Sequence, residues 1–493
     1  MFKGTINVVD LGARGDGSGN DGGIVQEAID RCSGEGGGTV YLPPGSYLSG
    51  PVILRTGVSL RLEGGAVLMA SRNPADYSDR GVFISAKGEE RITICGRGII
   101  DGQTREDLGR RPGHEGERRP SFRTRLLKFD ECQDVTVQGV TLRYSDAWTL
   151  HLWRCQNVVV DGVTVLNNYF RTNTDGINPD SCRDVHISNC HMVCGDDCIC
   201  IKTHSGYPCE NVVVNNCTLE SIATAIKIGT ESSGDFRNIL ISNCVVRNST
   251  VGLGIYVKDG GTVEGVACTN MAVETLTDSG SVNKPRLGNA TFPIFIDIER
   301  RTGSSPAGAV RDVILRGINI NSDNGVLVQG MGESKIENLT LGDISFRVTG
   351  VFSYEERRKH AGGRGNPEDD RIEVYARRPS YVTLANVDGL IVDNLRVYIP
   401  DQVFEENQRS ALHLEKVQNS MLSGIFREPP GEGDRYPALK LVNCRNLILT
   451  DRNDGENFAG VGGPESYGIR LPLSLGGIDL DPDVPGGAVN RNP

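Results

Sequence analysis

A short sequence pattern recurs along most of the 493-residue chain. Each copy has a turn residue, mostly Asn or Asp, at its third position, followed by alternating apolar and often β-branched residues and then a second turn. The first six copies are separated by one step of 23 residues and four steps of 27, and they start at Cys132, Cys155, Cys182, Cys209, Phe236 and Val263. Further copies start at Val310, Ile336, Val387, Val417 and Cys444. A regular period of this length is typical of solenoid proteins.

A single copy of this pattern has too few residues to form a core of its own. Stacked copies bury the inward residues of each coil against the next coil, at the spacing of about 4.8 Å between paired strands. Helical repeats are excluded by the strict alternation and by 62 glycines, which weaken helix interiors. The chain is therefore predicted to be all-β, a right-handed parallel β-helix formed as a single-stranded solenoid.

The segments that depart from the repeat suggest how the chain is organised. A helical pattern precedes the coils and ends in glycines, so it is expected to cap the first open coil. A polar, Gly-rich stretch interrupts the later coils and is expected to be a loop. We predict one β-helix domain over 1–452, with a short N-terminal capping helix at 24–33, coils carrying the candidate site at 130–350, an insertion loop at 351–375 and C-terminal coils at 376–452, followed by an irregular tail at 453–493.

The repeat accounts for several conspicuous polar and sulfur residues without any function. Cysteines that occupy the same point of successive coils are expected to form an inward ladder, and these are Cys190, Cys217 and Cys244. The asparagines that precede them are expected to form a hydrogen-bonded ladder of turns, and these are Asn189, Asn216 and Asn243. The 14 cysteines lie mostly in apolar runs, which favours reduced core thiols over disulfides. The spacing of Cys194, Cys198 and Cys200 does not match a structural zinc site.

Charge and hydropathy limit the partners of the chain. There are 52 Lys and Arg against 63 Asp and Glu, a formal net charge of −11, so no nucleic-acid partner is expected. No stretch approaches the roughly 20 apolar residues of a membrane helix, and the first residues lack the apolar core of a signal peptide. As the sequence stands we expect a cytoplasmic protein, and a mature secreted form that has lost its signal remains an alternative.

Two stretches, "NTDG" and "GDDC", bring three carboxylates onto neighbouring coils. Superposing the coils places Asp175 beside Asp196 and Asp197, at the start of adjacent strands. Inward positions of this sheet are expected to be Ile177, Ile199, Ile226 and Ile255. The alternation then directs two outward columns, one of Asn178, Lys227 and Tyr256 and one of Asp180, Lys202 and Lys258.

Crowded acids repel one another, so at least one of the three is expected to have a raised pKa. One protonated and one ionised carboxyl group are what glycosidic cleavage by general acid and base requires. A calcium site or a solvated acidic turn is the structural alternative. Calcium is disfavoured by the neighbouring lysines Lys202, Lys227 and Lys258, which would repel the ion. No metal and no organic cofactor is therefore expected.

With these two motifs on a β-helix, the chain resembles glycoside hydrolase family 28, the polygalacturonases and their relatives. The start of the chain, "INVVDLGARGDG" and "GGGTVYLPPGSYLSGPVIL", also resembles the pectin-lyase-like β-helices, so the likeness extends to about residue 350. The resemblance implies an inverting hydrolase. It further implies that Asp196 donates the proton and that Asp175 with Asp197 activates the water.

The sequence departs from this family at two motifs. Ala223, Thr224 and Ala225 stand where polygalacturonases usually carry Gly-His-Gly, and Tyr256-Val257-Lys258 stands in place of Arg-Ile-Lys. Some members that act on rhamnogalacturonan also lack that histidine. The segment "IKIGTESSGDFRN" resembles instead a segment of exo-acting members.

We therefore expect a glycosidase for an anionic, uronate-containing poly- or oligosaccharide. A polysaccharide lyase and a non-catalytic carbohydrate-binding β-helix are the alternatives. The expected substrate-binding residues are Lys258, Lys227, Lys202, Tyr256 and Asn178. The lysines either hold a substrate carboxylate or neutralise the three aspartates.

Overall fold

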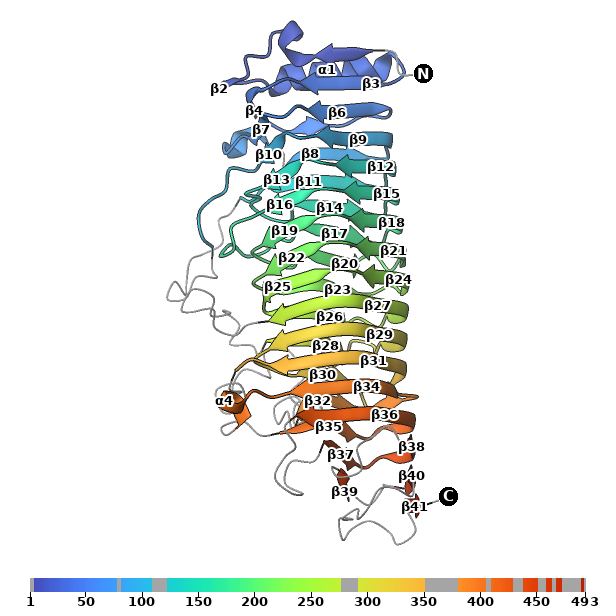
Figure 1. The fold of residues 1–493 in the computed structure, drawn as a ribbon. Helices are drawn as coiled ribbons and strands as arrows, with labels where there is room; N and C mark the ends of the chain where they lie inside the picture. The colour runs from blue at the N-terminus through green and yellow to red at the C-terminus, as the bar shows by residue number, and fades with distance from the viewer. Residues whose placement is uncertain are drawn as a thin grey trace. The chain divides into compact units, whose positions relative to one another are not determined.

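The computed structural model describes residues 4–77, 81–108, 122–275, 291–350, 380–404, 409–428, 438–450, 458–462, 467–471 and 489–491. The fold is a right-handed parallel β-helix, which confirms the predicted class (Figure 1). The chain divides into two compact units, Met1–Lys227 and Ile228–Pro493, and each is described by itself. The predicted single domain stays a prediction, and the predicted loop at 351–375 lies outside the described residues. Among the described helices, none is long and apolar enough to cross a membrane.

In unit 1, the helix expected at 24–33 corresponds to α1 (Gly22–Gly34). Val25, Ala28 and Ile29 lie on its buried face, because their spacing puts them on one side of the helix. Two short 3-10 turns, Val8–Leu11 and Pro74–Asp76, lie outside the coils.

The strands of unit 1 form three columns of parallel pairs. The first column contains β1 (Thr5–Asn7), β3 (Gly38–Leu42), β6 (Val58–Leu62), β9 (Glu90–Gly96), β12 (Gln133–Gln138), β15 (Gln156–Asp161), β18 (Arg183–Ser188) and β21 (Cys209–Asn215). The second contains β2 (Asp16–Asn20), β4 (Gly45–Ser49), β7 (Ala66–Ala70), β10 (Ile99–Asp101), β13 (Thr141–Arg143), β16 (Thr164–Leu166), β19 (His191–Cys194) and β22 (Thr218–Ser221). The third contains β5 (Val52–Ile53), β8 (Val82–Lys87), β11 (Arg125–Asp130), β14 (Leu150–Trp153), β17 (Ile177–Asp180) and β20 (Ile199–Thr203).

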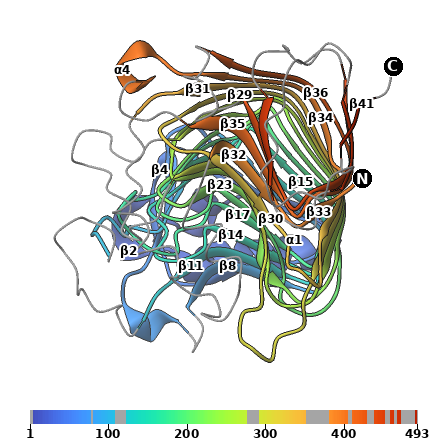
Figure 2. The same ribbon diagram turned by 90° about the horizontal axis from the view of Figure 1, so that it is seen from below.

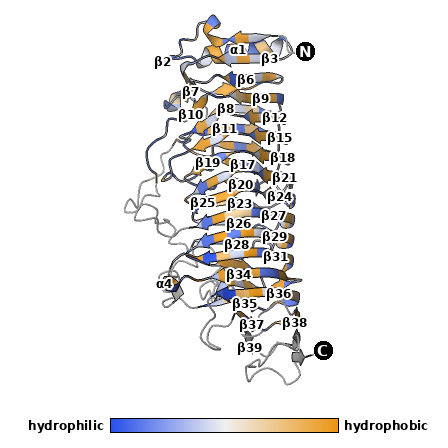
Figure 3. Cartoon of the chain, viewed as in Figure 1, coloured by the Kyte–Doolittle hydropathy of each residue, from blue (hydrophilic) through white to orange (hydrophobic). Residues whose placement is uncertain are grey.

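The register of the third column places equivalent residues of successive coils together. Leu150 pairs with Ile177, and Ile177 pairs with Ile199, as the superposed coils predict. Their side chains are buried, and hydrophobic and hydrophilic residues alternate along the strands (Figure 3). Figures 1 and 2 show β8, β11, β14 and β17 stacked one behind another. The third column carries the candidate site.

Unit 2 continues the same pattern with longer strands. Strand β23 (Thr224–Ser232) spans the division between the units. One set of parallel strands contains β24 (Phe236–Ser242), β25 (Val245–Ser249), β27 (Thr262–Thr275), β29 (Ala309–Ser322), β31 (Ile336–Val348), β33 (Val387–Asp388), β34 (Ile391–Tyr398), β36 (Gln418–Glu428), β38 (Arg445–Leu449), β40 (Tyr467–Leu471) and β41 (Val489–Arg491). The other contains β26 (Val251–Val257), β28 (Phe292–Ile298), β30 (Val326–Gln329), β32 (Ser380–Ala385), β35 (Ser410–Glu415), β37 (Leu439–Val442) and β39 (Phe458–Gly462). A short helix, α4, spans Asp401–Phe404.

The tail expected to be irregular contains strands that extend the coils. β39 pairs in parallel with β37, β40 with β38, and β41 with β40. Alternating apolar residues such as Tyr467, Ile469 and Leu471 explain why this segment forms a strand.

Both predicted ladders are present. The thiols of Cys190, Cys217 and Cys244 are buried, and none of the 14 cysteines forms a disulfide. Asn189 and Asn216 adopt positive φ angles of 58° and 56°, a conformation that Asn tolerates better than most residues. The amide nitrogen of Asn216 donates to the amide oxygen of Asn189 at 2.7 Å. The amide nitrogen of Asn189 donates in turn to Asp161 Oδ1 at 2.7 Å.

Candidate active site

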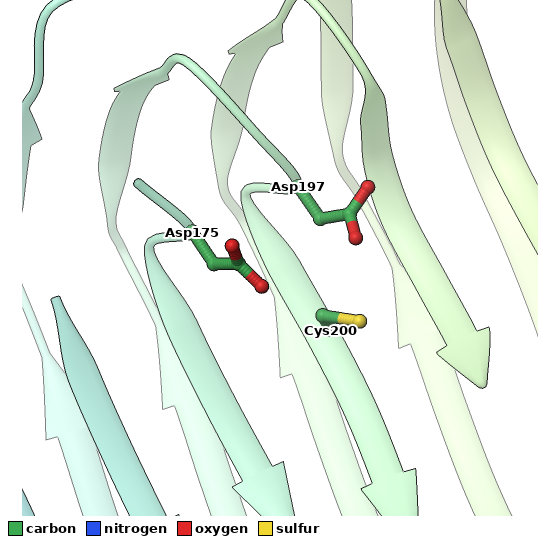
Figure 4. A group of neighbouring side chains, drawn as sticks. All are labelled: Asp175, Asp197 and Cys200. Carbon is green, nitrogen blue, oxygen red and sulfur yellow. The ribbon is translucent and has the colours of Figure 1, made fainter. Parts of the chain in front are cut away.

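The three aspartates lie at the start of two neighbouring strands of unit 1. Asp175 precedes β17, and Asp196 and Asp197 precede β20. Asp175 and Asp197 are buried, whereas Asp196 is half-buried. Figure 4 shows the carboxyl groups of Asp175 and Asp197 on the same side of the strands as the thiol of Cys200. Oxygen atoms of these two carboxyl groups lie within 4.8 Å of each other, a gap that one water bridges with two ordinary hydrogen bonds.

Two backbone N–H groups orient Asp196. Asn173 adopts a left-handed conformation with φ 59°, and its N–H donates to Asp196 Oδ2 at 2.9 Å. The N–H of Asp197 donates to Asp196 Oδ1 at 3.1 Å. The Asn of "NTDG" therefore supplies a turn that most side chains adopt only at a cost.

An ionic network of Arg171, Asp146 and Arg123 contacts the turn at Asn173. The Arg171 guanidinium binds Asp146 Oδ1, and both side chains are buried. Arg123 also binds the Asp146 carboxylate and donates to Asn173 Oδ1 at 3.2 Å. None of these groups was predicted from the sequence. Neither "RTNTD" nor "YSDAW" matches a pattern that links Arg171 to Asp146 across 25 residues.

Each buried carboxyl group has a lysine beside it. Lys227 Nζ donates to Asp197 Oδ2 at 2.9 Å, and Lys202 Nζ lies 3.9 Å from Asp175 Oδ2. The backbone N–H of Thr224, which stands where the related motif has histidine, donates to Asp197 Oδ1 at 3.1 Å. These two lysines therefore contact the aspartates, as neutralisation predicts.

The pKa of Asp175 lies well above its usual range, chiefly because burial penalises the charged form. The carboxylate of Asp196 raises the pKa further and that of Asp197 adds a smaller effect. The ammonium groups of Lys202 and Lys227 act in the opposite direction. The direction agrees with the prediction, but burial is the main cause and crowding by the other carboxylates is the smaller one.

Asp175, Asp197 and Cys200 are also placed to share a metal ion, because one ligand atom of each lies within 4.8 Å of the others. The contacts around them disfavour this. The ammonium groups of Lys227 and Lys202 lie beside the two carboxyl groups and repel a cation. Burial raises the pKa of the Cys200 thiol well above its usual range, which disfavours the thiolate that binds metals. We interpret the group as a site for water rather than for a metal.

The outward columns are more buried than predicted. Asn178 is 0% exposed, and Lys202 is 4% exposed. Side chains from neighbouring coils cover this face. Among them is the ring of Trp148, whose centroid lies 5.0 Å from Lys202 Nζ. Neither the oxygen nor the nitrogen of the Asn178 amide has a hydrogen-bond partner among the described residues. Each unpaired buried group of this kind costs about 1–3 kcal/mol.

Asp180, the next outward residue of β17, joins two histidines that we did not single out from the sequence. Its Oδ2 atom lies 2.7 Å from His204 Nδ1 and 3.3 Å from His151 Nε2. Hydrogen bonds to the two rings outweigh burial and hold the pKa of Asp180 below its usual range. Burial lowers the pKa of His151. A signal was available, because His151 precedes Asn178 by 27 residues, the length of one coil, and is its strand partner.

The two remaining predicted residues lie in unit 2. Lys258 forms an ion pair with the buried carboxylate of Glu299. The ring of Tyr256 packs on Phe295 with centroids 4.9 Å apart, at the edge of an apolar cluster.

Comparison with known proteins assigns the family. The model of glycosyl hydrolases family 28 matches residues 32–355, more than half of the chain. The chain belongs to this family. It is 31% identical over 218 residues to a probable polygalacturonase of Vitis vinifera, covering 40% of this chain and 44% of that protein. It is 28% identical over 207 residues to an exopolygalacturonase of Zea mays, covering 40% of this chain and 49% of that protein.

The fold of this family member also resembles a solved structure. The exopolygalacturonase of Thermotoga maritima superposes with a TM-score of 0.59 at 22% identity, covering 70% of this chain and 88% of that one. At this identity the likeness shows the fold alone. The chain spans about half the length of the curated relatives it matches.

Proposed function

We propose that the protein is an inverting glycoside hydrolase that cleaves pectin-type, uronate-containing poly- or oligosaccharides. The observation that carries this proposal is the placement of Asp175 and Asp197 within one water's reach, next to the more exposed Asp196. Asp196 donates a proton to the leaving glycosidic oxygen. Water held by the other two carboxyl groups attacks the opposite face of the sugar, which inverts the anomeric centre. The proton of the attacking water passes to whichever of these two carboxyl groups is ionised.

Exo action is the mode that we propose within this function. Its support is the similarity to an exopolygalacturonase of Zea mays and the segment from Ile226 to Asn238, which resembles exo-acting members. An exo enzyme releases short products from a chain end while the viscosity of the polymer falls slowly.

The test is turnover of polygalacturonate and rhamnogalacturonan fragments, followed by mass spectrometry of the products. Hydrolysis adds one water to each cleaved bond, and proton NMR of the first product reports its anomeric configuration. Asp196→Asn serves as the inactive control. An unsaturated product absorbing in the ultraviolet would instead identify a lyase. Binding without turnover across the glycan panel would identify a carbohydrate-binding protein.

A further inference from the structure

The orientation of the Asp196 carboxyl group depends on a turn of the preceding coil. The N–H of Asp197 donates to Oδ1 of Asp196 at 3.1 Å, and the N–H of Asn173 donates to Oδ2 at 2.9 Å. Two donors on different oxygens fix the plane of a carboxyl group. Asp197 is the next residue in the chain and moves with Asp196. Asn173 precedes Asp196 by 23 residues, so its own position decides how the carboxyl group is oriented.

The turn at Asn173 lies outside the strands that stack the coils. In the connection between β16 and β17, residues 167–176, an isolated bridge of Arg171 with Leu108 is the only strand-like pairing among the described residues. Asn173 itself has a left-handed φ of 59°. Strand pairing therefore does not fix Asn173, and side-chain contacts have to contribute to its position.

The guanidinium group of Arg123 joins this turn to another connection. It donates to the carbonyl oxygen of Thr172 at 2.6 Å and to Oδ1 of Asn173 at 3.2 Å. It also donates to Oδ1 of Asp146 at 3.3 Å and to the backbone carbonyl of the same residue, which lies between β13 and β14. A planar group with donors in a fixed fork suits these acceptors, whereas a lysine ammonium is a point charge on a flexible stem.

Asp146 is buried, and further groups fix its carboxylate. Nε of the buried Arg171 donates to Oδ1 at 3.0 Å, and the N–H of Thr124 donates to Oδ2 at 3.3 Å. A buried polar network of this kind is rigid when its members are paired. The position of the Asp146 carboxylate is therefore passed to Asn173 through Arg123.

Resting on the proposed hydrolase function, we propose that Arg123 and Asp146 are positioning residues that aim the Asp196 carboxyl group at the leaving glycosidic oxygen. They act through the backbone N–H of Asn173. Misplacing a reacting group by about 1 Å lowers a rate by about 10²-fold, so the effect is on kcat. The N–H bonds also favour the ionised carboxylate over the protonated acid, so they lower the pH at which the acid loses its proton.

Arg123→Lys is the first test, because it keeps the positive charge and removes the fork. For the polygalacturonate or rhamnogalacturonan fragment that the wild type turns over, kcat should fall about tenfold or more while KM stays within about threefold. The basic limb of the kcat–pH profile should move to higher pH, since weaker N–H bonding lets Asp196 keep its proton longer. A purely structural loss would lower the melting temperature and leave this limb in place. A kcat within threefold of wild type, or a basic limb that does not move, would overturn the proposal.

The groups that face Asp196 are the same in this variant. They include the carboxyl groups of Asp175 and Asp197, the ammonium groups of Lys202 and Lys227 and the thiol of Cys194. Position 123 also keeps its charge. A moved limb therefore reports the lost hydrogen bonds and not a change in the surrounding charge.

Arg143→Lys is the matched control. The Arg143 guanidinium binds the buried carboxylate of Asp101 at 2.8 Å, as Arg123 binds that of Asp146, but it lies on β13 and its partner lies on β10. This variant should leave kcat and the basic limb unchanged. An equal fall in kcat in the control would overturn the proposal, because any weakened ion pair of the unit would then have the same effect.

Asn173→Gly covers the case in which Arg123→Lys does not fold. Glycine keeps the left-handed turn and its N–H, and the change removes the side-chain bond to Arg123. It should lower kcat about threefold or more and move the basic limb in the same direction. No change in either quantity would overturn the proposal.

Turnover by the wild type is measured first so that the two proposals can be told apart. A wild-type protein that forms no hydrolysis product would overturn the hydrolase function and this positioning role with it. Hydrolysis by the wild type at a rate that the variants match would overturn the positioning role alone.

Discussion

Two asparagine amides in unit 1 have opposite environments. Asn216 lies at an exposed turn, and its amide donates to Asn189 at 2.7 Å in a ladder that continues to Asp161. Asn178 is fully buried and unpaired among the described residues, and a different residue, His151, stands one coil earlier. The ladder repeats, so the amide of each coil finds a hydrogen-bond partner on the neighbouring coil. The candidate site lies where the repeat is broken, and there both polar atoms of the Asn178 amide lack a partner among the described residues.

This contrast has an energetic side. The two unpaired groups of Asn178 cost about 1–3 kcal/mol each, a large share of the 5–15 kcal/mol that keeps a typical domain folded. The pKa of Asp175, raised chiefly by burial, shows that the ionised form of this carboxyl group is disfavoured as well. The groups of the candidate site therefore destabilise the fold, and the regular coils offset this loss.

The largest expected effect is on turnover. Asp196→Asn should reduce kcat about a thousandfold, because general acid catalysis contributes roughly 10²–10⁴ and an amide has no proton to give at working pH. Folding should be retained because the side chain is half-buried and its removal leaves no cavity. The measurements are initial rates, circular dichroism and substrate Kd. Activity within tenfold of wild type would remove Asp196 from the acid role.

The ladder of Asn189 and Asn216 could be predicted from the sequence, whereas most contacts of the candidate site could not. A period of 27 residues fixes which residues stack, so the β-helix, the Cys217 ladder and the turn at Asn216 follow from pattern alone. The same period aligns the coils that carry "NTDG" and "GDDC", so the three aspartates could be placed together from the sequence. Burial of Asn178 and the pairing of Lys258 with Glu299 depend on side chains of different coils, for which the repeat makes no rule.

The cluster of Trp148, His151, His204 and Asp180 was missed for a related reason. Trp148 lies in the connection between β13 and β14, where the chain leaves the repeat. His151 and His204 are brought to Asp180 by stacking, over separations of 29 and 24 residues. Aligning successive coils for polar residues at outward positions would have found the histidine on β14. The second histidine follows β20 and has no equivalent in the alternation.

The next effect is on stability and tests the ladder. Asn216→Ala should lower the free energy of unfolding by about 1–2 kcal/mol, since it loses a hydrogen bond and puts Ala at φ 56°. Asn216→Gly loses the same bond without the conformational strain, so it should cost less than the Ala variant at this position. Urea unfolding of both variants measures the difference. Equal losses would show that the turn conformation carries no cost, and no loss in either would show that the ladder is dispensable.

A smaller, pH-dependent effect tests the site. In wild type the folded state keeps a proton on Asp175 at pH values where the unfolded chain has released it, because the folded pKa is raised. Below the usual pKa of Asp both states carry the proton, and this group does not make stability depend on pH. As the pH rises from there toward the raised pKa, the unfolded chain releases its proton first, so the folded state loses stability. Asp175→Asn has no such group. Its melting temperature relative to wild type should therefore rise as the pH rises above about 4, the usual pKa of Asp.

The Asn variant also loses the ion pair with Lys202, which lowers its stability at every pH where wild-type Asp175 is charged. The test is therefore how the difference in melting temperature changes with pH, not its size at one pH. Thermal melts at matched ionic strength give it directly. A relative melting temperature that falls as pH rises would mean that Asp175 is stabilised as a carboxylate, contrary to the raised pKa.

The smallest expected effect concerns Lys258 in unit 2. Its ammonium group pairs with the buried carboxylate of Glu299, and a lysine that already compensates a buried acid contributes little to holding a substrate carboxylate. Lys258→Met should therefore change KM for an acidic oligosaccharide by less than about twofold, with the same salt dependence as wild type. It should lower the melting temperature, because Glu299 is left buried without this partner, and adding Glu299→Gln should restore much of the loss. Steady-state kinetics at low and high salt, with melts of the single and double variants, separate the two roles. A KM raised tenfold or more together with a weaker salt dependence would show that Lys258 holds the uronate rather than neutralising Glu299.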